Sequence, residues 1–149
     1  MLLKLDLSKA YDKLNWTFLE GVLRSFGFGE DWIKWIINLV SSAFFSVMAN
    51  GTPAAPFQAT RRILQGDPLS PFLFIIIAEG LGRMLKAMQE EHEIKGLQIC
   101  KGVQAKTHQQ FVDDNMLMGP ASIQEAQGIK QGLDTFLLAS GLEINKEKS

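Results

Sequence analysis

The sequence predicts a single α+β domain in which helices pack on one face of a small antiparallel sheet. Short segments with strand-like alternation are interspersed with longer segments whose apolar residues recur at helical spacing. Strands that pair across a sheet, with helices crossing one face, form a two-layer α+β domain. A length of 149 residues, of which 46% are hydrophobic, suits one globular domain.

The N-terminal half is expected to contain a strand over residues 2–6, two helices over residues 16–26 and 32–40, and a hairpin over residues 45–60. Asn15 is a suitable N-cap for the first helix, and Gly27 is a suitable stop. Asn50-Gly51 is a strong hairpin signal, so the strand over 45–49 is expected to turn there and return over 57–60. The three tryptophans lie in helical patterns and are expected to be core or helix-packing residues.

The C-terminal half is expected to contain two helices, over residues 71–88 and 123–137. It is also expected to contain three short strands, over residues 107–112, 115–118 and 142–144. Pro71 suits the first turn of a helix. Ser122 to Glu125 form a capping box, and Gly141 ends the helix behind it. Asp113-Asp114 is expected at the tip of the hairpin between the first two strands.

Composition excludes several classes of protein. One cysteine excludes a disulfide framework and a cysteine-rich zinc module. The longest apolar run, Phe72–Ala78, is far shorter than the roughly 20 residues of a membrane span. Early charges at Lys4 and Asp6 exclude a signal-peptide core, so an intracellular, soluble protein without a membrane partner is expected. The net charge of −1 gives no basic excess for binding nucleic acid.

Three carboxylates are candidates for chemistry. If the strands that hold Asp6 and Asp113-Asp114 are neighbours, these groups meet at one end of a sheet, where divalent cations would relieve their repulsion. Magnesium prefers carboxylate oxygens together with substrate phosphates, and two such ions stabilise both oxygens of a phosphoryl displacement. Taken alone, an Asp pair in a turn more often bonds its own backbone.

The segment Gln65–Pro71 changes that weighting. Gly66 allows a close backbone approach to a ligand, and Gln65 offers both a donor and acceptors. A helix-entry loop would explain Asp67 and Pro68 but not the whole string. The string resembles the QGDPLSP motif of reverse transcriptases from non-LTR (LINE-type) retrotransposons, especially those of plants. Three further segments resemble family motifs in the family's order, namely Lys4–Asp12, Phe111–Asp114 and Ser140–Ser149.

The resemblance covers essentially the whole chain and implies an RNA-directed DNA polymerase that uses dNTPs, an RNA template and a DNA primer. It implies two Mg²⁺ ions, for which Mn²⁺ can substitute. The implied metal set is Asp6, Asp113, Asp114 and the backbone carbonyl of Leu7, with Asp114 acting more electrostatically than as a ligand. The implied substrate-binding residues are Leu7, Tyr11, Gln65 and Gly66. Tyr11 would be a steric gate against a 2′-hydroxyl, and Gln65 and Gly66 would line the nucleotide pocket. Lys148 would protonate the leaving pyrophosphate.

By this resemblance, residues 1–149 are a partial reverse transcriptase domain, the polymerase palm from its first to its fourth catalytic motif. Fingers, thumb and endonuclease regions are then expected in the full-length element, together with the basic surface and a nuclear location. The chain departs from the family in the polar pair Gln109-Gln110, where apolar residues are usual, and in Arg62, which replaces a glycine of an R-G-L-R pattern.

Two alternatives remain open. One is a catalytically inactive remnant of a decayed retrotransposon, which the departures and the absent regions favour. The other is a small nucleic-acid-binding module on a similar sheet. Such modules stack bases on exposed aromatics, and the predicted strands contain no aromatic pair. His92 and His108 lack the spacing of a metal site.

Overall fold

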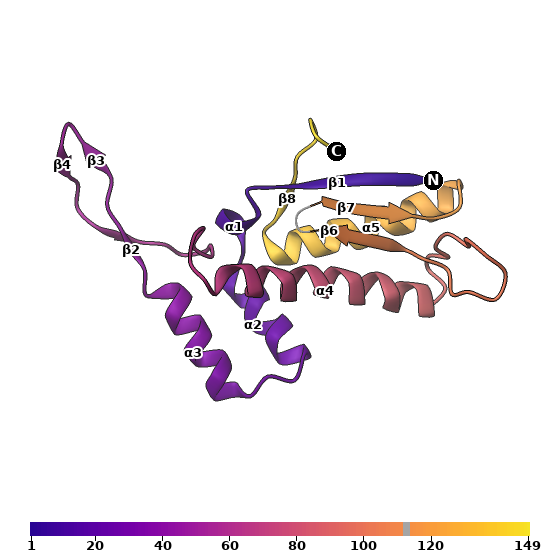
Figure 1. Cartoon of the computed structure of the whole chain (residues 1–149), viewed down its shortest axis with the longest axis horizontal. Helices are drawn as coiled ribbons and strands as arrows, with labels where there is room; N and C mark the ends of the chain where they lie inside the picture. Colours follow the sequence, from indigo (N-terminus) through magenta and orange to yellow (C-terminus); the bar gives the residue numbers. More distant parts are fainter. Residues whose placement is uncertain (112–113) are drawn as a thin grey trace.

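A computed structural model describes residues 1–111 and 114–149 of the chain (Figure 1). The elements, in chain order, are β1 (Leu2–Ser8), α1 (Ala10–Lys13), α2 (Trp16–Ser25), α3 (Glu30–Ser41), β2 (Phe44–Phe45), β3 (Met48–Ala49), β4 (Thr52–Pro53), β5 (Phe57–Gln58), α4 (Ser70–Glu90), β6 (His108–Phe111), β7 (Asp114–Met118), α5 (Ile123–Ser140) and β8 (Glu143–Ile144).

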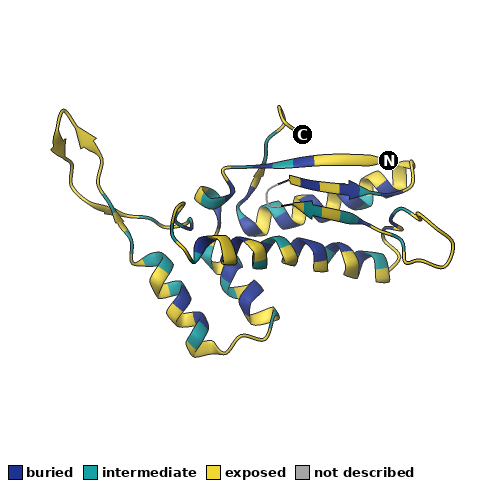
Figure 2. Ribbon diagram, viewed as in Figure 1, coloured by how far each residue is buried: buried dark blue, intermediate teal, exposed yellow. Residues whose placement is uncertain are grey.

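The main sheet has the strand order β6-β7-β1-β8, and each pair of neighbours is antiparallel. Helices α4 and α5 lie on one side of it (Figure 1). Leu5 and Leu117 point from the sheet into the same buried cluster as Leu81 of α4 and Leu133 of α5. The other face is open to solvent, because Lys4, Gln109 and Met116 lie on it and are exposed. Exposed residues of the strands are yellow in Figure 2. The predicted α+β architecture is therefore confirmed.

Local capping signals act as the sequence predicts. Asn15 accepts a hydrogen bond from the backbone N–H of Thr17 at 2.8 Å and begins α2. Ser122 accepts one from the backbone N–H of Glu125 at 3.2 Å and begins α5. Gly141 has a φ of 75° and ends α5, in a conformation that glycine adopts without a steric penalty.

The strand boundaries differ from prediction where a partner from elsewhere in the chain decides them. Strand β1 continues past Asp6 to Ser8, because β8 pairs with Leu7 and Ser8. Asp114 was expected in the turn, but it is the first residue of β7, opposite Phe111 of β6. The tryptophan prediction is wrong for Trp35, which is 70% exposed on α3.

The predicted hairpin over 45–60 is broken into two short ribbons that project from the body as an arm (Figure 1). Asn50 and Gly51 have φ values of 51° and 78°, as the predicted turn requires. The turn joins β3 to β4, whereas β2 pairs with β5. Two residues, 46–47, separate β2 from β3, whereas three residues, 54–56, separate β4 from β5. The unequal spacers shift the register, so one continuous ladder cannot form.

Gln110 shows how a polar residue is accommodated on the buried side of the sheet. The two glutamines of β6 point to opposite faces, as strand alternation requires, and Gln110 points toward α4. Its amide donates a hydrogen bond to the carbonyl of Ala78 at 2.9 Å. The hydrogen bond offsets the cost of burying the amide, so this departure from the family pattern is compatible with folding.

Arg62 has a φ of 107°, a conformation that favours glycine. The segment around it is held in place, because its N–H donates to the Leu14 carbonyl at 2.9 Å and its carbonyl accepts from the indole of Trp16 at 2.6 Å. Its guanidinium lies 3.2 Å from Asp12 and 4.4 Å from the centre of the Phe45 ring. Asp12 therefore helps to hold the segment around Arg62 in place.

Backbone strain at this position makes a testable prediction. Arg62→Gly and Arg62→Ala remove the same guanidinium contacts, but only glycine relieves the strain. We expect the glycine variant to be more stable than the alanine variant by about 1 to 2 kcal/mol in urea unfolding. Equal stability of the two variants would show that the backbone at Arg62 is unstrained.

Candidate active site

The register of β1 against β7 places Asp6 directly opposite Asp114. Met1 and Gly119 exchange both hydrogen bonds of their pair, at 2.7 and 3.2 Å. Because the two kinds of pair alternate along an antiparallel ladder, Asp6 and Asp114 form a non-hydrogen-bonded pair. In such pairs the Cβ atoms approach to about 4.5–5.5 Å. Two carboxylates are thus brought together on one face.

That face is the solvent side of the sheet. Leu5 and Leu7 alternate with Asp6 along β1 and are buried against the helices, so Asp6 points the other way. Lys4 shares the face of Asp6, and its ammonium lies 3.1 Å from an oxygen of Asp114. Both partners of this ion pair are about half exposed. Sequence reasoning missed Lys4, although its position two residues before Asp6 is the signal that it shares that face.

The C-terminal turn is bonded to the main chain of Asp6. The N–H of Asn145 donates to the Asp6 carbonyl at 2.8 Å, and the Asp6 N–H donates to the hydroxyl of Ser149 at 3.0 Å. Lys148 belongs to the same turn, since its N–H donates to the Asn145 carbonyl at 3.2 Å. Successive carbonyls of a strand point in opposite directions, so the Leu7 carbonyl is directed toward the β7 side.

A cavity of about 250 Å³ lies next to the end of β1, and its lining brings together three of the predicted substrate-binding residues, Leu7, Tyr11 and Gln65. Lys9, Ala10 and Asp12 complete the lining. The Tyr11 ring stacks on Phe74 of α4, with centroids 5.1 Å apart and an interplanar angle of 21°. Gly66 follows Gln65 with a φ of 95° and does not line the cavity.

The predicted residue Asp113 lies outside the described residues. Among residues 1–111 and 114–149, no group of three acidic, histidine or cysteine side chains is arranged to hold a metal ion. Asp6 and Asp114 supply carboxylate oxygens on one solvent-facing side, which is the chemistry that Mg²⁺ prefers. The donor set therefore fits a hard divalent cation. None of the helices formed by residues 1–111 and 114–149 has the length and hydropathy needed to span a membrane.

Comparison with known proteins identifies relatives over the whole chain. The family model described as "Reverse transcriptase (RNA-dependent DNA polymerase)" matches residues 1–149. The Pol polyprotein of the type-2 retrotransposable element R2DM of Drosophila melanogaster is 28% identical over 144 residues. The match covers 97% of this chain and 13% of that protein. The Pol polyprotein of the type-1 element R2 of Popillia japonica is 24% identical, over 97% of this chain and 23% of the relative.

Solved structures share the fold. Telomerase from Candida tropicalis, in complex with a fragment of telomeric RNA, matches with a TM-score of 0.73 and 15% identity, over 99% of this chain and 25% of the telomerase chain. At this identity the likeness concerns the fold alone. The palm-like α+β fold, the four motifs and the R2 relatives agree with one another, and the chain belongs to the reverse transcriptase family.

Proposed function

We propose that residues 1–149 are the palm region of an RNA-directed DNA polymerase, from its first to its fourth catalytic motif. In the reaction, the 3′-hydroxyl of a DNA primer on an RNA template attacks the α-phosphorus of a dNTP. A new phosphodiester bond forms, the bond to the bridging oxygen breaks, and pyrophosphate leaves. The observation that supports this most directly is the pairing of Asp6 with Asp114 beside a cavity lined by Leu7, Tyr11 and Gln65.

The metal-binding part of the proposal assigns Asp6, Asp113 and the Leu7 carbonyl as ligands, with Asp114 nearby as an electrostatic support. Two Mg²⁺ ions, or Mn²⁺ in their place, would stabilise the charge on the attacking and leaving oxygens. The ion pair of Lys4 with Asp114 supports the secondary role of Asp114, because an ammonium at 3.1 Å already offsets part of its charge.

The substrate-binding part assigns the cavity at the end of β1 to the incoming nucleotide. Tyr11 would reject a 2′-hydroxyl, and its stacking on Phe74 would keep the ring in one orientation. Gln65 lines the cavity, and Gly66 gives the following turn its positive φ. Lys148 would protonate pyrophosphate, since its turn is bonded to the main chain through Asn145 and Asp6.

The proposal extends to the full-length element. This chain spans 13% of the length of its Drosophila relative. In the proposal, the fingers, thumb and endonuclease regions would lie in the rest of the full-length protein. Most contacts with the template and primer backbone would come from those regions, because this chain has a net charge of −1. A nuclear location of the full-length product is part of the same proposal.

A second candidate function is that of an inactive remnant. Arg62 favours it, because this residue adopts a glycine-like conformation where the family pattern has glycine.

Primer extension separates the two candidates. The chain is incubated with an RNA template, a labelled DNA primer, dNTPs and either Mg²⁺ or Mn²⁺. Extension that EDTA abolishes would support the polymerase. No extension, even with Mn²⁺ and a large excess of protein, would support the remnant.

A further inference from the structure

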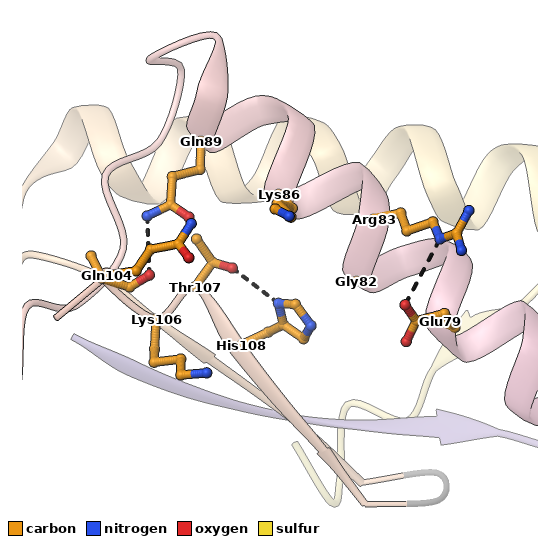
Figure 3. A pocket seen from close by; sticks show the side chains of 10 residues that line it. Glu79, Gly82, Arg83, Lys86, Gln89, Gln104, Lys106, Thr107 and His108 are labelled. Atoms are coloured by element: carbon orange, nitrogen blue, oxygen red, sulfur yellow. Dashed lines mark hydrogen bonds and ion pairs between the residues drawn. The ribbon is translucent and has the colours of Figure 1, made fainter.

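A second cavity lies away from the paired aspartates, between α4 and the segment that leads into β6 (Figure 3). Its volume is about 270 Å³. The lining consists mainly of polar and charged side chains, from Glu79, Arg83, Lys86 and Gln89 of α4 and from Gln104, Lys106, Thr107 and His108. His108 lies on the helix side of the sheet, whereas Asp6 and Asp114 face solvent on the other side.

The charge around this cavity is positive. Arg83, Lys86 and Lys106 line it together with one carboxylate, that of Glu79. The ion pairs of the two α4 cations are long, since Arg83 lies 3.8 Å from Glu79 and Lys86 lies 3.9 Å from Glu90, with all four side chains more than half exposed. The Arg83 guanidinium also lies over the Phe26 ring, 3.7 Å from its centroid. Lys106 has no ion pair within the described part of the chain. The cavity is thus a local cationic site on a chain whose net charge is −1.

The edge of the sheet adds main-chain donors beside the cations. The N–H of Met118 donates to the Thr107 carbonyl at 2.8 Å. In an antiparallel ladder every second residue pair is hydrogen-bonded, so His108, the next residue after Thr107, belongs to a pair that is not. The N–H of His108 is therefore directed to the outer edge of β6. No strand formed by the described residues pairs with that edge. Oriented N–H groups next to cationic side chains are a favourable environment for an anion.

His108 is held at the wall of the cavity. Its ring packs against Gly82, where an added Cβ would lie 2.7 Å from Nε2, so a larger residue at this position of α4 would displace the ring. Nδ1 lies 2.9 Å from the hydroxyl of Thr107. Burial lowers the pKa of His108 and the nearby charge of Lys106 lowers it further, whereas Glu79 raises it. Arg83 and Lys86 line the same cavity from α4.

We propose that this cavity binds a phosphate group, supplied by the backbone of a nucleic-acid strand that passes along α4 and the outer edge of β6. Three cationic side chains and a main-chain N–H suit the several oxygens of a phosphate. The site is separate from the proposed polymerase centre, so a chain that fails to extend a primer can still bind phosphate here. Free phosphate or a mononucleotide is the competing source of the same group.

The first experiment titrates inorganic phosphate into the intact chain and follows the ring protons of its two histidines by NMR. We expect the His108 resonances to shift and the pKa of His108 to rise, because a bound anion favours the imidazolium form. His92 lies outside the cavity lining and serves as an internal control. If His108 does not respond, or if both histidines shift alike, the site does not exist.

The second experiment identifies the source of the phosphate. Binding of a labelled single-stranded RNA is measured against salt for the double variant Lys86→Gln/Lys106→Gln. The control is Lys34→Gln/Lys130→Gln, which makes the same charge change at exposed lysines outside the lining. We expect the pocket variant alone to reduce the slope of log K against log salt by about 0.7, the value for one lost phosphate contact on a single strand. Equal slopes for wild type and pocket variant would overturn the assignment to a nucleic-acid strand.

Discussion

Asp113→Asn is expected to reduce metal-dependent primer extension by on the order of 10³-fold or more. Bound metal ions stabilise the transition state by several kcal/mol. A loss of roughly 1.36 kcal/mol of this stabilisation lowers the rate tenfold. Asparagine has nearly the same shape as aspartate but lacks its charge, so it weakens metal binding with little effect on packing. The rate of incorporation of the first nucleotide, measured with Mg²⁺ and with Mn²⁺, gives the effect directly.

The matched control for this substitution is Asp31→Asn on α3. Asp31 is exposed, and its nearest cation is Lys34 at 3.7 Å, so the variant makes the same charge change away from the paired strands. We expect its extension rate to equal that of wild type. Thermal unfolding of both variants checks that the fold is intact. Extension that persists at the wild-type rate in Asp113→Asn would remove Asp113 from the catalytic site.

Glu125→Ala is expected to cause the largest loss of stability, about 3 kcal/mol. Glu125 is 3% exposed, and its carboxylate accepts hydrogen bonds from the backbone N–H groups of Lys95 and Gly96 at 3.0–3.1 Å. Alanine would leave these donors without an acceptor, and each unsatisfied buried group costs about 1–3 kcal/mol. The free energy of unfolding in urea measures the loss, which is a large fraction of the roughly 5–15 kcal/mol of a typical domain.

Two further variants separate the buried contacts of Glu125 from a general effect of charge. Glu125→Gln keeps an oxygen that can accept from Lys95 or Gly96, and we expect it to lose only about 1 kcal/mol. Glu91→Ala removes an exposed carboxylate at the end of α4 and is expected to be nearly neutral. If Glu91→Ala and Glu125→Ala were equally destabilising, the backbone contacts of Glu125 would not be the cause.

Much of the fold follows from local signals. Asn15 and Ser122 begin helices through bonds to N–H groups two and three residues away, so a short stretch of sequence is sufficient to predict them. The turn at Asn50-Gly51 depends only on backbone preferences and forms as predicted. The arm around it departs from prediction, because the register of a ladder depends on the lengths of both strands together.

Site residues divide along the same lines. Asp6, Tyr11 and Gln65 are recognisable from the motifs in which they stand. Two contacts cannot be recognised from motifs, because each depends on which strand or helix lies alongside. They are the ion pair of Lys4 with Asp114 and the hydrogen bond of Gln110 to the Ala78 carbonyl. The phosphate-binding cavity belongs to this second group, since its lysines come from α4 and from the segment before β6.

By itself the sequence determined the α+β class, the approximate positions of the four longer helices α2 to α5, and the membership of the reverse transcriptase family. Its motifs and caps are contiguous, and contiguous residues keep their chemistry whatever surrounds them. Only the tertiary structure decided that Asp6 lies opposite Asp114, that Asp114 lies within β7, and that a cationic cavity forms beside His108. Pairing register and packing between distant segments decide these features, because they depend on contacts between residues that are far apart in the chain.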